Sequence, residues 1–476
     1  MSTARRIAKN TFALIVSFLV QRILALLLII LIARKLGVEN FGIYSFVFSF
    51  VLLFSAISDF GLNSMVFRDI PQNKKKVKQI LGSGIALKTI TSLITIFLIL
   101  FFVGFIGYKK ELFLLIVLAS FSMVFDSFSE LFRSVYLAFE KMELDFFYQL
   151  FSRGVLLVFS FYVLFSGMGL TELIIAYFAA SFFGLIFAMF LVLSQTGFPV
   201  IKFDYFALKK TFTLASPFFL IVLFSTIYSN IGVTLVGQIS GMKETGIFSA
   251  AFRIVLAMGF LNIAFISSVF PVLSKFYAES NKSFSLLIVN SFRYIMVLVM
   301  PIVFGIIILS ERIISLVYPS SYATASIVLK ILVWFMLFNF VSYLFLFVLN
   351  SSKKEKSAGF FLGLTLVLSI FLNVVLIGRF GAVGASWALI ISEFFFMVLC
   401  YLKIKGFVVI PFFVILKSLF KPLVASILMS LFILLIFSFN FFMIVPLAAI
   451  FYFAVLFFIK GFSKQDFVLL RRIINR

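Results

Sequence analysis

The sequence predicts an all-α polytopic membrane protein, with about 14 transmembrane helices arranged as two pseudo-symmetric six-helix lobes plus two C-terminal helices. Of its 476 residues, 64% are hydrophobic and only 12% are charged, whereas a soluble domain carries about a quarter charged residues. Apolar runs of about 20 residues, the length a helix needs to cross the hydrocarbon core, recur along the whole chain. A glycine-containing turn also occurs twice, which indicates an internal repeat.

The apolar-length rule places the membrane spans in order along the chain. They cover residues 11–33, 41–65, 80–106, 112–135, 146–166, 171–194, 211–237, 246–270, 287–309, 326–350, 357–377, 383–402, 418–438 and 441–460. Residues 1–200 form an N-terminal lobe of six spans, residues 201–405 a C-terminal lobe of six, and residues 406–476 the last two spans with a tail. No stretch remains for a soluble domain.

The basic residues predict the orientation of these spans. With the N-terminus inside, 27 Lys and Arg residues fall in inner segments and 7 in outer segments. Inner loops of membrane proteins carry an excess of Lys and Arg. We therefore expect a multi-pass protein of the cytoplasmic membrane with both termini on the cytoplasmic side.

The composition also excludes several kinds of function. The net charge of +23 is spread over many short loops, so the inner-loop bias explains it better than nucleic-acid binding does. The chain has no histidine, which removes His general bases and His metal ligands. Its single cysteine, Cys400, lies in an apolar run and indicates packing. We expect no enzyme activity, no cofactor, no metal and a monomeric protein.

The internal repeat predicts the two-lobed architecture. Residues 37–45 and 241–249 both read Gly, four residues, Gly-Ile, an aromatic residue and Ser, and each copy lies at the start of a span. A weaker similarity pairs residues 140–143 with residues 353–356. Repeats in the same orientation are related by an axis along the membrane normal. Residues 378–385 form another turn rich in small residues, which would let spans 11 and 12 pack closely.

Two arginines are the strongest candidates for a polar pathway. Arg22 lies near the middle of the first span, beside Gln21, and Arg253 lies about two turns into the eighth span, with Asn262 further along. A charged side chain at this depth is costly and by default faces a protein interior or a water-filled cavity. We predict that these four residues bind substrate in a central cavity; the alternative is a buried structural ion pair.

Acidic residues within spans are candidates for ion coupling. Asp126 and Glu130 share one face of the fourth span, and Glu393 lies alone in the middle of the twelfth. Desolvation favours the neutral form of a carboxylic acid, so we expect one of them to bind Na⁺ or H⁺ during transport. For Glu130, a local ion pair with Arg133 is an equal alternative.

Other polar or irregular positions have simpler interpretations. The cations Lys88, Arg153, Arg293 and Lys330 are placed near span ends, where long side chains reach the interface. Asp59 would cap a helix or pair with Arg68. Pro217 in the seventh span removes a helix hydrogen bond and is the best hinge candidate.

The motifs together resemble the polysaccharide-biosynthesis flippases (Wzx-like) of the multidrug/oligosaccharidyl-lipid/polysaccharide (MOP) exporter superfamily. The resemblance covers spans 1–12. It rests on Lys9-Asn10-Thr11, Ala33-Arg34-Lys35-Leu36-Gly37, Phe41-Gly42-Ile43-Tyr44, Asp59-Phe60-Gly61-Leu62 followed by Arg68, Gly246-Ile247-Phe248-Ser249-Ala250-Ala251 with Arg253, Pro271 with Ser274, Asn373-Val374-Val375-Leu376-Ile377, and Phe380-Gly381-Ala382-Val383-Gly384-Ala385 with Glu393.

The resemblance implies a V-shaped bundle of two lobes that flips a lipid-linked oligosaccharide by alternating access. In the related lipid II flippases, arginines of spans one and eight line a cationic cavity, and Arg22 and Arg253 match them. Those proteins carry a second arginine in span one where this chain has Leu28. This difference makes lipid II itself a less suitable substrate.

Physical chemistry favours the same substrate class. A polyprenyl-pyrophosphate head group is anionic, and arginines offer it bidentate phosphate contacts. One alternative is a cation-coupled exporter of drugs or small solutes, which Asp126, Glu130 and Glu393 would suit. A membrane enzyme acting on lipid-linked sugars is a more distant alternative, because the outer loops hold almost no carboxylates. A scramblase or scaffold is more distant still.

Overall fold

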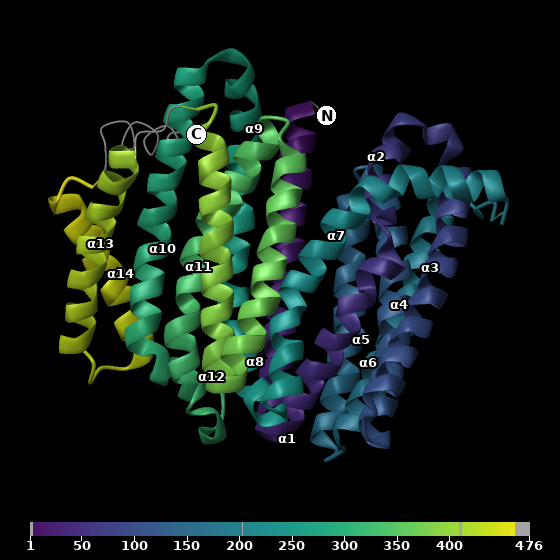
Figure 1. Cartoon of the computed structure of the whole chain (residues 1–476), viewed down its shortest axis with the longest axis horizontal. Helices are drawn as coiled ribbons and strands as arrows, with labels where there is room; N and C mark the ends of the chain where they lie inside the picture. The colour runs from purple at the N-terminus through teal and green to yellow at the C-terminus, as the bar shows by residue number, and fades with distance from the viewer. Residues whose placement is uncertain (1–2, 202, 409–411, 462–476) are drawn as a thin grey trace. The chain divides into compact units, whose positions relative to one another are not determined.

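Every regular element in the described part of the chain is a helix, which confirms the predicted all-α class (Figure 1). The computed structural model describes residues 3–201, 203–408 and 412–461. Side chains are described from residue 24 onward, apart from those of residues 74, 264, 412, 414 and 415.

Fourteen α-helices and two short 3₁₀ turns make up this structure. The helices are α1 (Thr3–Asp59), α2 (Leu62–Gln72), α3 (Val77–Ile106), α4 (Lys110–Ala138), α5 (Met142–Phe165), α6 (Leu170–Thr196), α7 (Tyr205–Ile239), α8 (Met242–Ala257), α9 (Gly259–Glu279), α10 (Asn281–Val317), α11 (Ala325–Ser351), α12 (Glu355–Lys405), α13 (Phe412–Leu435) and α14 (Phe441–Phe458). The 3₁₀ turns cover Lys74–Lys76 and Ser320–Tyr322.

The predicted number of spans agrees with the helices. Among the described residues, 12 helical segments are long and apolar enough to cross a membrane. Two of these segments contain a glycine with non-helical backbone angles, Gly37 in α1 and Gly381 in α12. Dividing the two segments at their glycines gives about fourteen spans. The division of residues 402–460 into two spans is also confirmed, because α13 and α14 are separate helices.

Two spans are interrupted where the sequence predicted continuous helices. The second span breaks between α1 and α2, and the eighth breaks between α8 and α9. At the first break, a β-carbon on Gly61 would lie 2.7 Å from the Ala215 carbonyl oxygen. The ring of Phe60 stacks on Phe212 and Phe219, with centroids 4.6 and 4.5 Å away. Helix α7 therefore packs against this break, and Gly61 permits the close approach because it has no β-carbon.

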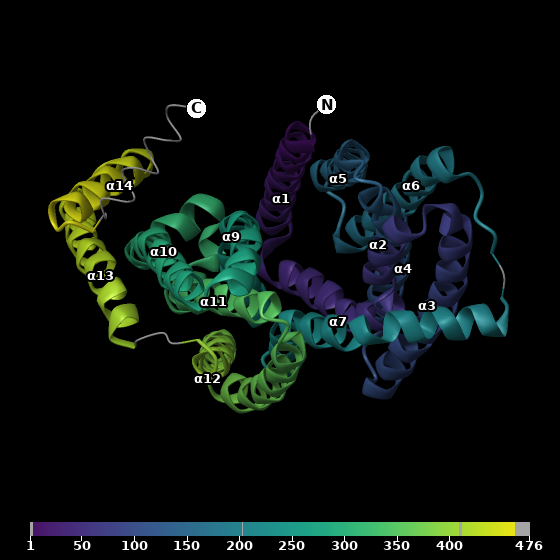
Figure 2. The same ribbon diagram turned by 90° about the horizontal axis from the view of Figure 1, so that it is seen from above.

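Contacts divide the chain into two compact units. The first contains residues 1–249 and 370–385, and the second contains residues 250–369 and 386–476. In the first unit α4 packs against α6, and α1 packs against α5 and α7 (Figures 1 and 2). In the second, α10 packs against α11 and α13. These units are a different division from the predicted lobes, whose boundaries stay a prediction.

Both repeats found in the sequence have matching backbone conformations. Gly37 and Gly241 begin the two copies of the glycine motif, and both are left-handed, with φ of 77° and 87°. The weaker similarity is also matched, because Glu140 and Lys353 are left-handed residues with φ of 59° and 57°. Few residues other than glycine adopt this conformation. The agreement supports a structural duplication.

The two glycine motifs pack against each other reciprocally within the first unit. A β-carbon on Gly42 would lie 1.8 Å from the carbonyl oxygen of Met242. A β-carbon on Gly246 would lie 2.0 Å from the carbonyl oxygen of Val38. In each case the second glycine of one copy touches the residue that follows the first glycine of the other copy. The contact therefore has the two-fold pattern expected of a repeat, and only glycine fits it.

Aromatic side chains surround this reciprocal contact. A β-carbon on Gly237 would lie 2.4 Å from the Phe46 ring, so this ring lies directly on α7. Tyr108, in the loop between α3 and α4, accepts a hydrogen bond from Gln238 of α7 and lies edge-on to Phe46 and Phe50. Burial raises the pKa of Tyr108. The start of the second span is thus packed firmly against the end of α7.

The turn after the eleventh span also packs as the sequence predicted. A β-carbon on Gly384 would lie 2.1 Å from the carbonyl oxygen of Leu376, so the two halves of α12 approach closely. The carboxylate of Glu244 accepts a hydrogen bond from the backbone N–H of Ala382, at 3.0 Å, next to the break at Gly381. A carboxylate at a helix start satisfies a free N–H group and interacts favourably with the helix dipole.

In the second unit, α13 and α14 are attached to α10 by two polar contacts. Pro301 lacks an N–H group, which leaves the carbonyl of Val297 without its helical partner. The buried hydroxyl of Tyr452 in α14 donates to this carbonyl at 2.9 Å. Arg312 donates to the carbonyls of Phe437 and Phe439, which follow α13. The two last helices are thus fixed by backbone acceptors of α10 and of their own connecting turn.

Replacing Tyr452 by phenylalanine is expected to destabilise the protein by about 1–3 kcal/mol, because the Val297 carbonyl would lose its buried donor. Thermal unfolding of the purified protein in detergent measures this effect. Tyr136→Phe is the matched control, since the buried Tyr136 hydroxyl has no partner among the described residues. Equal melting temperatures for the Tyr452→Phe variant and the parent would contradict the proposed attachment.

Candidate functional site

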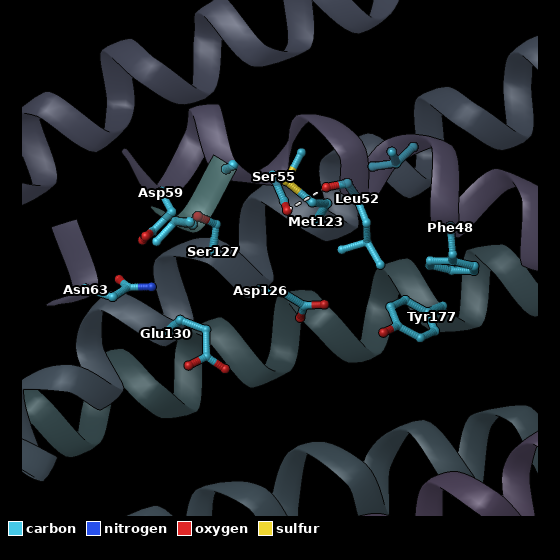
Figure 3. Close-up of a pocket in the computed structure, with 13 residues that line it drawn as sticks. Phe48, Leu52, Ser55, Asp59, Asn63, Met123, Asp126, Ser127, Glu130 and Tyr177 are labelled. Carbon is cyan, nitrogen blue, oxygen red and sulfur yellow. Dashed lines mark hydrogen bonds between the residues drawn. The ribbon is translucent and has the colours of Figure 1, made fainter. Parts of the chain in front are cut away.

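A pocket with several polar side chains in its lining lies within the first unit, between helices α1, α2, α4, α6 and α7 (Figure 3). Its volume is about 320 Å³. Its lining residues are Phe48, Val51, Leu52, Ser55, Ala56, Asp59, Asn63, Met123, Asp126, Ser127, Glu130, Tyr177 and Val222. The predicted coupling residues Asp126 and Glu130 are therefore brought together on one wall, with Asp59 near Ser127.

Asp59 is paired with a buried lysine rather than with Arg68. The Lys88 side chain is 0% exposed, and its ammonium lies 3.3 Å from Asp59 Oδ1 and 3.1 Å from Asn63 Oδ1. Arg68 instead pairs with Asp69 at 2.5 Å. The interface position predicted for Lys88 and the Asp59–Arg68 pair are both wrong. The reason is that α3 begins at Val77, so Lys88 lies too deep in the helix to reach water.

Glu130 forms the ion pair that was one of its two predicted roles. Arg133 donates to Glu130 and also to Asp145, whose carboxylate lies 2.7 Å from Arg133 Nη2. The Arg133 guanidinium lies 5.4 Å from the centre of the Tyr148 ring. Glu130 remains half exposed, at 51%, and faces the pocket. The ion pair is therefore present, and the carboxylate still faces the pocket.

Asp126 lies deeper on the same helix and interacts with groups from α5 and α6. Ser181 donates a hydrogen bond to its carboxylate, and the guanidinium of Arg153 stabilises its negative charge. Arg153 also donates to the hydroxyl of Tyr177. Arg153 therefore turns inward, contrary to the interface position predicted for it. The pocket carboxylate is held between two helices by a cation and a hydroxyl.

Among the described side chains, the carboxylates of this region outnumber the cations that interact with them. Four carboxylates (Asp59, Asp126, Glu130 and Asp145) interact with three cations (Lys88, Arg133 and Arg153). Asp126 lies within a membrane span, where an uncompensated charge is costly. One proton or one monovalent cation would neutralise the excess. The pocket is thus suited to exchange a small cation, and its hydroxyl and amide groups are oxygen ligands of the kind Na⁺ prefers.

The second unit contains a buried chain of polar side chains. Asn262 of α9 donates to Asn339 of α11 at 3.5 Å, and Asn339 donates to Glu393 of α12 at 3.2 Å. Asn262 and Glu393 are each only 2% exposed. The structure therefore links one predicted substrate residue to one predicted coupling residue. Asn339, which connects them, was not singled out in the sequence.

Arg253 lies on α8, half-buried, where its charge acts on the hydroxyl of Tyr318. Tyr318 in turn donates to the carbonyl of Ala250 at 3.2 Å. No carboxylate forms an ion pair with Arg253 among the residues that the structure describes. The Arg253 guanidinium is therefore available to bind an anionic ligand. The roles predicted for Arg253 and Asn262 in substrate binding stay predictions.

The other two predicted substrate residues, Gln21 and Arg22, have side chains outside the described residues. Their backbone belongs to α1.

Pro217, the predicted hinge, lies inside α7 without breaking it. Its missing N–H leaves the carbonyl of Thr213 without the usual partner, and the Ser216 hydroxyl donates to that carbonyl at 3.2 Å. This compensation is local, so the helix can bend here without exposing an unpaired group. The role of Pro217 as a hinge stays a prediction.

Several polar residues of these sites were missed, and the sequence held a signal for some of them. Because α3 begins at Val77, Lys88 lies about as many residues from the start of its helix as Arg22 lies from the start of its predicted span. Asn63, Ser127 and Asn339 are uncharged, and their types are common in spans. Only the packing of neighbouring helices shows that they face the charged groups.

Comparison with known families identifies the class of this protein. The family model of polysaccharide biosynthesis proteins matches residues 7–277, more than half of the chain. The model of the lipid II flippase MurJ family matches residues 198–453. A probable low-salt glycan biosynthesis flippase, Agl15 of Haloferax volcanii, is 30% identical over 166 residues. This alignment covers 35% of each protein, so it spans about a third of that relative's length.

Solved structures show the same fold. The lipid II flippase MurJ in an inward closed conformation superposes with a TM-score of 0.79 at 16% identity, covering 95% of this chain and 99% of that one. A MATE-family multidrug resistance transporter in an inward-facing conformation gives a TM-score of 0.67 at 14% identity, covering 81% and 94%. The chain therefore belongs to the polysaccharide biosynthesis protein family, and residues 198–453 also match the lipid II flippase MurJ family model.

Proposed function

We propose that this protein flips a polyprenyl-pyrophosphate-linked oligosaccharide across the cytoplasmic membrane by alternating access. The observation that carries this proposal is Arg253, a half-buried guanidinium within a span and without a carboxylate partner among the described residues. The names of the relatives support the same class of substrate, because they describe flippases of glycan or lipid II pathways.

The chemistry of the substrate explains why such an arginine is needed. A pyrophosphate cannot enter hydrocarbon unless cations and water compensate its charge. A guanidinium makes two parallel hydrogen bonds to phosphate oxygens, which adds geometric specificity to charge attraction. In the proposal Arg253 and Arg22 share the pyrophosphate, Gln21 and Asn262 contact the adjacent polar groups, and the lipid tail stays in the membrane.

Alternating access requires a contact that forms in one state and separates in the other. The reciprocal contact of Gly42 with Met242 and of Gly246 with Val38 has the properties of such a contact. It joins equivalent positions of the two repeats, and it depends on backbone surfaces alone. The lysine and arginine count supports an arrangement in which this contact lies near the outer face and both termini are cytoplasmic.

Ion coupling forms a second part of the proposal. The excess carboxylate of the first unit and the buried Glu393 of the second are the groups that would take up Na⁺ or H⁺. Asp126 is the preferred group in the first unit because it lines the pocket from within a membrane span, where desolvation favours a neutralised carboxylate. A cation-coupled exporter of small solutes would use the same groups, so the transported substrate decides between the two functions.

Asp126→Asn and Glu393→Gln are expected to remove the dependence of transport on pH or on a Na⁺ gradient. Each substitution keeps the size of the side chain and removes the group that gains or loses charge. Flipping rates in proteoliposomes, recorded across a series of pH values and Na⁺ gradients, measure the effect. Glu111→Gln, an exposed change on the same helix as Asp126, is the control. If both variants keep the parental dependence, neither carboxylate couples transport to an ion.

The proposed substrate is tested by transport of a labelled polyprenyl-pyrophosphate oligosaccharide in proteoliposomes, compared with transport of a cationic drug such as ethidium. A flippase of this class transports the labelled oligosaccharide lipid and does not transport ethidium. Transport of ethidium alone would support the exporter function instead.

A further inference from the structure

The segment that connects α6 to α7 presents an unusual row of exposed apolar side chains. Phe198 is 79% exposed and Phe206 is 78% exposed. Between them, Val200, Ile201, Phe203 and Tyr205 are exposed as well. Large aromatic rings are rarely left in water in such number, and Trp and Tyr in particular concentrate at the membrane interface. The row thus requires a partially apolar environment.

This segment is fixed to the start of α3. The backbone N–H of Val200 donates to the carbonyl of Lys78 at 3.2 Å. A β-carbon on Gly82 would lie 2.0 Å from the Val200 carbonyl oxygen, so the segment lies directly on the α3 backbone. Figures 1 and 2 both show the start of α7 beside α3. The exposed aromatic rings are therefore held on a rigid support.

Five exposed lysines lie on the elements that this contact joins. They are Lys75 and Lys76 in the 3₁₀ turn before α3, Lys78 in the first turn of α3, and Lys209 and Lys210 in the first turns of α7. Among the residues with described side chains, none of these lysines forms an ion pair with a carboxylate.

Two acidic groups close to these lysines in the sequence have partners of their own. Asp204 caps α7 by accepting a hydrogen bond from the Ala207 N–H at 3.0 Å, and Asp69 pairs with Arg68. The surface therefore carries an excess of positive charge.

We propose that this interfacial platform, consisting of residues 198–201 and 203–206 and the five lysines, docks on anionic phospholipid head groups of the membrane leaflet. Aromatic rings enter the boundary between head groups and acyl chains, while lysines bind the phosphates above it. Clusters of four to eight basic residues next to a membrane span are typical of sites for anionic lipids. The platform thus anchors the connection between the two repeats. It does not depend on the proposed substrate.

A local fluorescence measurement tests the platform without using transport. Phe206→Trp places a tryptophan on the platform and keeps an aromatic ring there, in a protein whose Trp334 and Trp387 are replaced by phenylalanine. The protein is reconstituted in vesicles with equal parts of phosphatidylcholine and phosphatidylglycerol. In one preparation the brominated lipid is phosphatidylglycerol, and in the other it is phosphatidylcholine. Bromine quenches only a nearby tryptophan.

We expect brominated phosphatidylglycerol to quench the tryptophan fluorescence more strongly than brominated phosphatidylcholine does. Each contributing lysine should favour the anionic lipid about fivefold. Lys209→Gln with Lys210→Gln removes most of this preference, and so does high salt, because it screens exposed charges. Lys109→Gln with Lys110→Gln, a pair of exposed lysines at the other end of α3, leaves it unchanged. Equal quenching by both lipids, or quenching by neither, would overturn the proposal. Quenching by neither lipid would mean that the platform does not face lipid.

Discussion

Arg253→Ala is expected to lower the affinity for a polyprenyl-pyrophosphate oligosaccharide about tenfold to a hundredfold. This range corresponds to the loss of one charge-assisted contact, about 1.5–3 kcal/mol, in a partly hydrated site. Arg22→Ala should have an effect of the same size. Lysine at either position keeps the charge but loses the bidentate geometry, so it should restore part of the activity. Flipping rates in proteoliposomes over a range of substrate concentrations give these values.

The control for these variants separates binding from folding. Arg379→Ala removes an exposed arginine of α12 and should leave transport unchanged. If the two span arginines only stabilise the structure, their alanine variants would give less folded protein, and the folded fraction would flip substrate at the parental rate. That outcome, for both variants, would show that neither arginine takes part in substrate binding.

Gly42→Ala and Gly246→Ala are expected to reduce flipping about tenfold to a hundredfold. A β-carbon at either position would lie within about 2 Å of a backbone carbonyl oxygen, and neither backbone can yield as a side chain would. Overpacking of this kind costs about 1–3 kcal/mol, paid only in the state in which the two motifs touch. The variants should therefore favour the separated state, and the normalised flipping rate measures the effect.

Matched glycines are available for comparison. Gly104, Gly154 and Gly378 lie in helices with no atom within 4 Å of an added β-carbon, so alanine should be tolerated there. Alanine is also more favourable than glycine in a helix, by about 1 kcal/mol. Helix propensity therefore cannot explain a loss of flipping in the Gly42→Ala and Gly246→Ala variants. Parental flipping by folded Gly42→Ala and Gly246→Ala proteins would mean that the contact takes no part in transport.

Much of the fold could be predicted from the sequence because its determinants are local. Span lengths follow from the thickness of the hydrocarbon core. The internal repeat could be recognised because the same glycine motif occurs at residues 37–45 and 241–249. The left-handed conformations of Gly37 and Gly241 agree with that motif. The break at Gly61 was missed because it depends on the approach of α7, a partner distant in the sequence.

The candidate site could be predicted only in part. Asp126, Glu130 and Glu393 were found because a charge in a span is conspicuous on its own. Of their partners only Arg133, three residues from Glu130 on the same helix, was predicted, because the other pairings depend on which helices face each other. Lys88 was assigned to the interface, since its helix was started three residues too late, and its neighbour Asp59 was assigned to Arg68. Asn339 carries no charge, so only its position between Asn262 and Glu393 reveals it.

The most direct test of the central claim is transport by the purified protein alone. Proteoliposomes are prepared with a labelled polyprenyl-pyrophosphate oligosaccharide in both leaflets, and a glycan-modifying enzyme added outside reports the fraction that is accessible. Protein-free liposomes should stop at the outer-leaflet fraction. Liposomes with the protein should approach complete modification, and those with the double variant Arg22→Ala, Arg253→Ala should stay near the protein-free level. Modification that stops at the outer-leaflet fraction with well-folded parental protein, under every pH and Na⁺ gradient tried, would contradict the proposed flippase function.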